Sequence, residues 1–150
     1  MANKIVTDEV RKQIGKVGEP RHYEVEKGHI RRFADAIGDT NPIFNDETAA
    51  RRTRFGGLIA PPTFYRFMSS PVPDIKLPGF EGFRGLDGGS DWEYFQPIRP
   101  GDRITAQSKL VDIREGEGRL GPMIFITIEH SYTNQFGELC ATQRSTGIRY

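Results

Sequence analysis

Hydrophobic residues recur with two different periods along this chain. In the first half, apolar positions follow the i, i+3, i+4, i+7 spacing of one helix face, which predicts an amphipathic helix that ends at Gly38. A short strand is predicted over 23–25, just before this helix. From residue 103 onward, apolar and polar residues alternate, which is typical of half-buried strands. The helical positions are Ile30, Phe33, Ala34 and Ile37, and the alternating positions are Ile104, Ala106, Leu110, Ile124, Ile126, Ile128 and Tyr132.

Two more helical segments are predicted between these regions. Asp46 precedes the sequence Glu-Thr-Ala-Ala and offers an N-cap to a short helix. A second helix is predicted over about 62–70, where a proline suits the first turn and Phe64, Phe67 and Met68 form an apolar stripe. We expect this second helix to be buried.

The connections complete the outline of the fold. Prolines and glycines are frequent over 71–89, which predicts an irregular crossing from the helical half to the sheet half. Within it, the glycines at 88–89 are expected to serve backbone geometry by allowing a positive φ. Stretches rich in glycine and polar residues over 114–121 and 134–138 are expected to join antiparallel strands. Residues 1–150 are therefore expected to form one α+β domain whose sheet wraps a buried helix.

The composition limits which binding partners and which cellular compartment we expect for this chain. Lysine and arginine number 21 against 20 for aspartate and glutamate, so the net charge of +1 predicts no general attraction to nucleic acid or to anionic lipid. Residues 1–20 lack a long apolar core, so we expect neither a signal peptide nor a membrane-spanning segment. The single cysteine, Cys140, excludes an intrachain disulfide and a thiolate metal cage. A cytoplasmic protein fits these features best.

Three segments carry a family resemblance. They are FADAIGDTNPIFND over 33–46, FGGLIAPPTF over 55–64 and GGSDWEYFQPIRPGDRITAQSKL over 88–110. In this order they resemble the N-terminal, FAS1-like branch of the MaoC-like dehydratases. The resemblance implies a single hot-dog fold, an antiparallel sheet around a central helix, that pairs into dimers. It also implies acyl thioesters of coenzyme A or acyl carrier protein as substrates, hydrated at a 2-enoyl group or dehydrated at a 3-hydroxyacyl group without a metal or redox cofactor.

The resemblance also exposes two missing catalytic parts. In catalytic members an Asp and a His five residues later hold a water as general base and acid. Carried to this chain, the Asp is Asp39 and the motif Asn is Asn41, but the His position holds Phe44, which can neither accept nor donate a proton. Active relatives have His-Gly where this chain has Pro61-Pro62, and Pro62 lacks the N–H that would bind the thioester oxygen.

Further residues are expected to contact substrate. Ser70 matches a serine that lines the site in active relatives, and Arg54 lies in an arginine-rich run that suits coenzyme A phosphates or an acidic carrier protein. Each assignment has a structural alternative, because Asp39 and Asn41 can cap turns of their own loop, Arg54 can lie on a solvated helix end, and the aromatic stripe can be plain core packing. The expected substrate contacts are Pro62, Thr63, Phe64, Ser70 and Arg54.

The two losses predict a heteromeric hydratase in which this chain accommodates the acyl chain and a MaoC-like partner supplies the catalytic Asp and His. One alternative is a self-sufficient homodimer that recruits a substitute base, such as Asp46 or a histidine moved by the fold. Another is a non-catalytic acyl-thioester binding module. A hot-dog thioesterase would need a carboxylate on or near the central helix, and 63–70 contains none. The dispersed His22, His29 and His130 show no metal-ligand spacing and are expected to have surface or structural roles.

Overall fold

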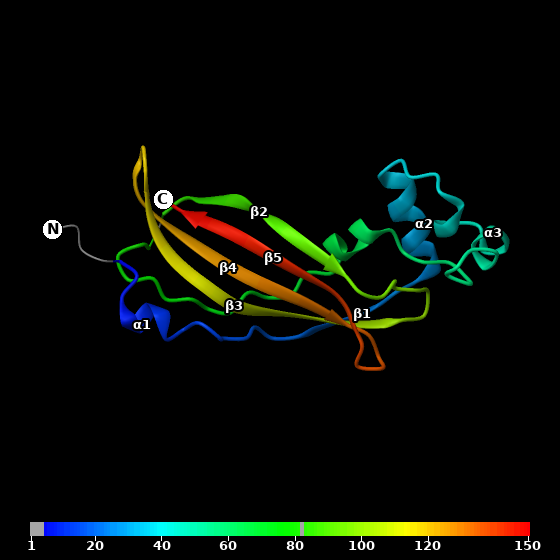
Figure 1. Cartoon of the computed structure of the whole chain (residues 1–150), viewed down its shortest axis with the longest axis horizontal. Coiled ribbons are helices and arrows are strands. Elements are labelled where there is room, and N and C mark those ends of the chain that lie inside the picture. Colours follow the sequence, from blue (N-terminus) through cyan, green and yellow to red (C-terminus); the bar gives the residue numbers. More distant parts are fainter. Residues whose placement is uncertain (1–4, 82) are drawn as a thin grey trace.

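A single antiparallel sheet of five strands, in the order β1-β3-β4-β5-β2, forms the body of the protein in this computed structural model, which describes residues 5–81 and 83–150. Helices α2 and α3 lie together at one end of the sheet and α1 lies toward the other (Figure 1). The elements are α1 Asp8–Arg11, β1 Arg21–Glu24, α2 Lys27–Ala36, η1 Pro42–Phe44, α3 Glu47–Arg51, η2 Pro62–Phe67, β2 Gly85–Tyr94, β3 Arg103–Gly118, β4 Gly121–Thr133 and β5 Leu139–Arg149, where η marks a 3-10 helix.

The predicted α+β architecture is confirmed, and the alternating residues supply the inner face of the sheet. Strands β3, β4 and β5 pair as a meander, and the predicted connection over 134–138 joins β4 to β5. One core cluster lies toward the helices and includes Ile30, Phe44, Phe64 and Tyr132. A second cluster lies toward α1 and includes Ile124. All seven alternating apolar positions are buried.

Local signals in the first half are also confirmed. Asp46 caps α3, because its Oδ1 accepts a hydrogen bond of 3.0 Å from the Ala49 backbone N–H. Helix α2 buries Ile30 and Ala34, and Gly38 follows it with a φ of +70°, the left-handed conformation that favours glycine at a helix end. Ile37 lies beyond the helix and is 49% exposed, so the predicted apolar face is one residue shorter at this end.

The predicted helix over 62–70 is wrong in length and type. Segment η2 is a 3-10 helix that ends at Phe67, and the Phe67 side chain is 53% exposed, whereas Phe64 and Met68 are buried as predicted. The C-cap residue Met68 leaves the helical conformation with a ψ of 81°. Proline at 71 disfavours the α conformation of Ser70 and cannot donate to a helix, so the helix does not resume before the extended segment. Over 71–81 the described residues form neither helix nor strand and run along the sheet (Figure 1).

Strand β2 begins inside the predicted loop over 71–89. Residues 85–87 and 90–94 pair with β5, and a bulge separates the two paired stretches. Gly89, within the bulge, has a φ of +102°, which confirms the expected role of this glycine pair. The loop prediction is therefore wrong from Gly85 onward. The glycines at 88–89 form a bulge within a strand and do not indicate that the segment lacks a strand.

Strands β3 and β4 continue through 114–121, which was predicted to be a connection. Gly118 pairs with Gly121, so the turn is confined to 119–120. A Cβ at Gly116 would lie 2.9 Å from the ring of Phe125, so the glycine leaves space for an aromatic side chain to cross the neighbouring strand. Here glycine serves cross-strand packing, and its presence gave a misleading loop signal.

No helix among the described residues is long and apolar enough to cross a membrane. The expectation that residues 1–20 contain no signal peptide falls partly outside the described residues, because the structure does not describe residues 1–4.

Candidate functional site

The loop between α2 and α3, residues 38–46, holds its polar side chains by local hydrogen bonds. Asp39 Oδ1 accepts from the Asn41 backbone N–H at 3.0 Å, and Asn41 Oδ1 accepts from the Ile43 backbone N–H at 3.2 Å. Asn41 thereby caps η1, so both residues have a turn-forming role. Phe44 is 4% exposed and its ring belongs to the core cluster near the helices. Phe44, which the resemblance matches to the catalytic imidazole of the family, is thus a core residue in the structure.

Arg54 and Pro62 line the same hollow, which has a volume of about 370 Å³ and a mainly apolar, aromatic wall. The Arg54 guanidinium lies 4.8 Å from the ring centroid of Phe55, a cation–π contact at the same hollow. Thr63 is exposed, and the buried Phe64 belongs to the core, so neither lines this hollow. The structure therefore brings together two of the five expected substrate contacts here.

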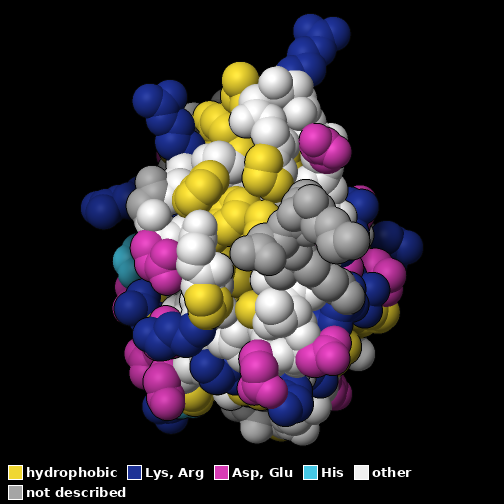
Figure 2. All heavy atoms as spheres, turned by 90° about the vertical axis from the view of Figure 1, so that its left-hand side faces the viewer, with side chains coloured by type: hydrophobic (Ala, Val, Ile, Leu, Met, Phe, Trp, Pro, Cys, Tyr) yellow, Lys and Arg dark blue, Asp and Glu magenta, His cyan; other side chains and the backbone are white. Residues whose placement is uncertain are grey.

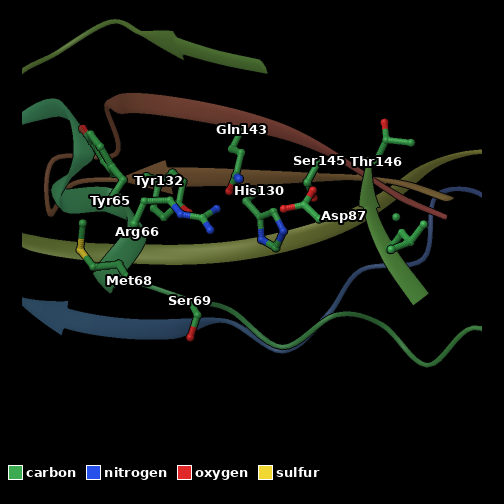
Figure 3. A pocket seen from close by; sticks show the side chains of 12 residues that line it. Tyr65, Arg66, Met68, Ser69, Asp87, His130, Tyr132, Gln143, Ser145 and Thr146 are labelled. Atoms are coloured by element: carbon green, nitrogen blue, oxygen red, sulfur yellow. The ribbon is translucent and has the colours of Figure 1, made fainter. Parts of the chain in front are cut away.

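A second hollow, of about 480 Å³, lies between η2 and strands β4, β5 and β2 (Figure 3). Ser70 does not line it but contacts His130, which does. The Ser70 hydroxyl is part-buried, and its Oγ lies 3.1 Å from Nδ1 of His130. His130 and Gln143 point into this hollow from the sheet, Arg66 reaches it from η2, and Asp87 faces it from β2 (Figure 3).

The electrostatics of this second hollow favour neutral groups on the sheet. Burial lowers the pKa of His130, and the nearby positive charge of Arg66 lowers it further, so the imidazole is neutral at pH 7. Burial raises the pKa of Tyr132 to about 12 and also raises that of Tyr65, so both phenols keep their protons. Among the described residues, no group of three His, Cys, Asp or Glu side chains could hold a metal ion.

Two further hollows, of about 490 and 440 Å³, continue from the second one along the inner face of the sheet. The second hollow and the 490 Å³ hollow share the lining residues Leu86, Ser145 and Gly147. The 490 Å³ and 440 Å³ hollows share Ile75 and Leu77 among other residues. We call these three adjoining hollows the sheet groove. One wall is formed by residues of 72–81 together with Phe83, and the other by β4, β5 and β2. Hydrophobic side chains are exposed among charged ones on the face at the α1 end (Figure 2).

The family model for the FAS1-like dehydratase domain region matches residues 12–143. The chain belongs to this family. A UPF0336 protein of Streptomyces griseus is 35% identical, with 80% of each chain covered. A Thermomonospora curvata protein named a probable enoyl-CoA hydratase alpha subunit is 33% identical; the match covers 89% of this chain but 48% of that protein, so this chain spans about half its length.

Among solved structures, a chain of the ChsH1–ChsH2 complex of Mycobacterium tuberculosis superposes with a TM-score of 0.80 at 22% identity, covering 95% of this chain and 89% of that chain. The predicted MaoC-like resemblance and the predicted hot-dog fold are thus confirmed.

Within this MaoC-like fold, sequence reasoning missed the polar residues of the sheet groove. His130 was expected to be at the surface or structural, and Gln143, Arg66 and Asp87 were not singled out. One signal was present in the sequence: His130 occupies the inward phase of the alternation that runs from Ile124 to Tyr132. A polar residue in that phase faces the inner side of the sheet.

Proposed function

We propose that this chain is the substrate-accommodating half of a heteromeric hydratase/dehydratase of acyl thioesters, and that a second MaoC-like chain supplies the catalytic Asp and His. The observation that carries the proposal is the burial of Phe44 in the core at the position of the family imidazole. Acid/base chemistry at this position would need a titratable group, and a buried phenyl ring has none.

The remainder of the motif supports the same conclusion. Pro62 begins η2 and has no N–H to donate to a thioester oxygen. Asp39 already accepts a backbone hydrogen bond within its own turn. Neither the acid/base pair nor the oxyanion donor of the family motif is present, so the chemistry is assigned to a partner chain. The proposed reaction needs no metal or redox cofactor.

The sheet groove supports the role in acyl-chain accommodation. Its walls include Ile126 and Ile128 of β4 and Ile75 and Leu77 of the extended segment. The path along β4 from Tyr132 to Ile126, both of which line the sheet groove, spans about 20 Å, since an antiparallel strand rises about 3.4 Å per residue. An extended chain advances about 1.2 Å per bond, so a long acyl chain matches this length. The early end of η2 leaves this face of the sheet without a covering helix.

The edge of the sheet supports assembly with a partner. β2 is a terminal strand in the sheet order, and nine of its ten residues are exposed, as its burial pattern shows. Leu86 and Tyr94 on this strand are 52% and 49% exposed. An unpaired strand edge with apolar residues is a template for pairing with another chain. The solved neighbour forms a complex of two different proteins, and one relative is named an alpha subunit, which is consistent with a heterodimer.

The decisive test is enoyl-CoA hydration, followed as loss of enoyl-thioester absorbance, by this chain alone, by a MaoC-like chain with the intact Asp and His motif alone, and by both after co-expression. We expect activity on long-chain substrates only in the mixture. Equal activity of this chain alone would overturn the proposal, and its loss in His130→Gln would then identify His130 as a substitute base. Tight acyl-CoA binding without turnover in any arrangement would instead indicate a binding module.

A pair of variants tests the contribution of this chain to the mixed enzyme. Ser145 lines two hollows of the sheet groove, so Ser145→Phe should block the groove and lower kcat/KM for long-chain substrates while leaving short-chain substrates unaffected. Thr142 lies on the same strand but lines none of these hollows, so Thr142→Phe is the matched control. An equal effect of both variants on both substrates would contradict the assigned role of the groove.

A further inference from the structure

A row of polar side chains crosses the inner face of the sheet. Ser108 of β3 lies opposite His130 of β4, and His130 lies opposite Gln143 of β5, so the three residues share one face in one line. The neighbouring rows are mainly apolar. On one side they contain Ala106, Tyr132 and Ala141, and on the other Leu110, Ile128 and Ser145.

Structural hydrogen bonds account for part of this row. The Ser108 side chain is fully buried and its hydroxyl donates to the carbonyl oxygen of Pro71. Ser70 Oγ lies 3.1 Å from Nδ1 of His130. These contacts attach the start of the extended segment to the sheet. They leave Nε2 of His130 without a hydrogen bond to any described residue.

No structural hydrogen bond within the described part of the chain accounts for the buried amide of Gln143. Its side chain is 6% exposed, yet its amide forms no hydrogen bond with any residue in the described part of the chain. No fully shielded side-chain nitrogen or oxygen among the described residues lacks a partner, so the Gln143 amide atoms must keep some contact with the hollow. Figure 3 shows this amide directed into the hollow beside the His130 ring. A buried amide aimed at an open hollow is available to a ligand.

The charges around the hollow indicate what kind of ligand fits. Arg66 and Asp87 contribute one charge of each sign, so the hollow has no excess charge to attract an ion. In the tautomer in which the Ser70 hydroxyl donates to Nδ1, the neutral His130 ring carries its proton on Nε2 and can donate it to an oxygen. In the other tautomer Nε2 accepts from a hydroxyl hydrogen. The Gln143 amide can donate to that same oxygen or accept from its hydroxyl hydrogen.

We propose that Gln143 and His130 bind an uncharged oxygen group, a hydroxyl or a carbonyl, carried on the acyl chain, and so select oxygenated acyl thioesters over plain hydrocarbon chains. The identity of the ligand as an acyl thioester rests on the proposed function. Because the sheet groove continues beyond Gln143 into a mainly apolar hollow, a long chain passes this polar pair and presents an oxygen from within its length.

The test is a binding measurement that requires no turnover. Trp92, the only tryptophan, lies opposite Gln143, and its ring stacks against Tyr132, so its fluorescence reports on this part of the sheet. The probes are hexadecanoyl-CoA and a series of hydroxyhexadecanoyl-CoA thioesters with the hydroxyl at successive carbons, with calorimetry as the second readout. We expect at least one hydroxylated probe with an internal hydroxyl to bind about three- to tenfold tighter than the plain probe, the effect of one or two neutral hydrogen bonds.

Two variants assign the preference to these residues. Gln143→Leu should remove the preference while plain hexadecanoyl-CoA binds at least as tightly as before, and His130→Phe should reduce it. Gln107→Leu is the matched control, because Gln107 donates to the Gly18 carbonyl at 3.2 Å and lines no hollow of the groove. Circular dichroism confirms that each variant is folded.

Several results would overturn the inference: equal affinity for all probes, binding of none, or a preference that survives in both variants. A preference confined to the hydroxyl next to the thioester would also overturn it, because it would place the reacting group at Gln143. Failure of the proposed function is seen separately, as an absence of hydration by the mixture, whatever the binding preference.

Discussion

Restoring the family histidine by Phe44→His should destabilise the protein without creating a hydratase. Phe44 is 4% exposed and packs in the core cluster near the helices. Burial of a phenylalanine side chain stabilises a fold by about 1.5–3 kcal/mol, and a buried imidazole without a partner costs a further ~1–3 kcal/mol. We expect a loss of about 3 kcal/mol in the free energy of unfolding, measured by urea denaturation.

The matched control is Phe136→His, since Phe136 lies in the β4–β5 turn and is 76% exposed. This substitution should change the free energy of unfolding by less than about 0.5 kcal/mol. Phe44→His should also remain inactive in the enoyl-CoA assay, because Pro62 still lacks the N–H and Asp39 still accepts a backbone hydrogen bond. A Phe44→His protein as stable as the wild type would refute the core role of Phe44. A Phe44→His protein that hydrates enoyl-CoA alone would refute the roles assigned to Pro62 and Asp39.

Three further predictions concern backbone packing, pH and thiol reactivity. A Cβ at Gly18 would lie 2.5 Å from Ser108 Oγ and collide with the Pro71 carbonyl, so Gly18→Ala should lower the free energy of unfolding by about 2 kcal/mol in urea titrations, whereas Gly28→Ala, with no atom within 4 Å, should be neutral or stabilising. Because the pKa of His130 is lowered in the fold, the unfolded chain binds a proton below its usual pKa of 6.5 that the folded chain does not. Stability should therefore fall as the pH drops below 6.5, and urea midpoints of His130→Gln should fall less over the same range; parallel curves would contradict this. Burial raises the pKa of the Cys140 thiol to about 11, so at pH 8 the native protein should react with a thiol reagent far more slowly than the denatured chain, and rapid native labelling would show that the thiol is accessible.

Local signals in the sequence predicted most of the elements but not all of their limits. Alternation in β3 and β4 and the N-cap at Asp46 depend on neighbouring residues, and these predictions are confirmed. Prediction failed at Gly116 and at Gly85–Gly89, where glycine lies within a strand. A glycine that makes room for a cross-strand side chain and a glycine that makes a turn look alike in sequence, because the difference depends on the partner strand.

Some features of the candidate site could likewise be predicted from the sequence, and others depend on the fold. The loss of the family's acid/base pair and N–H donor could be predicted from residue chemistry alone, since phenylalanine has no proton to exchange at any geometry and proline has no N–H. The second hollow could not be predicted, because Ser70 and His130 are 60 residues apart in sequence and meet only through the fold. Gln143 joins them through strand register, and a shift of one residue would turn its side chain to the opposite face. The sequence by itself therefore predicted which catalytic groups of the family motif are missing. Only the tertiary structure decided which polar groups line the groove, because strand register arises from contacts between distant segments.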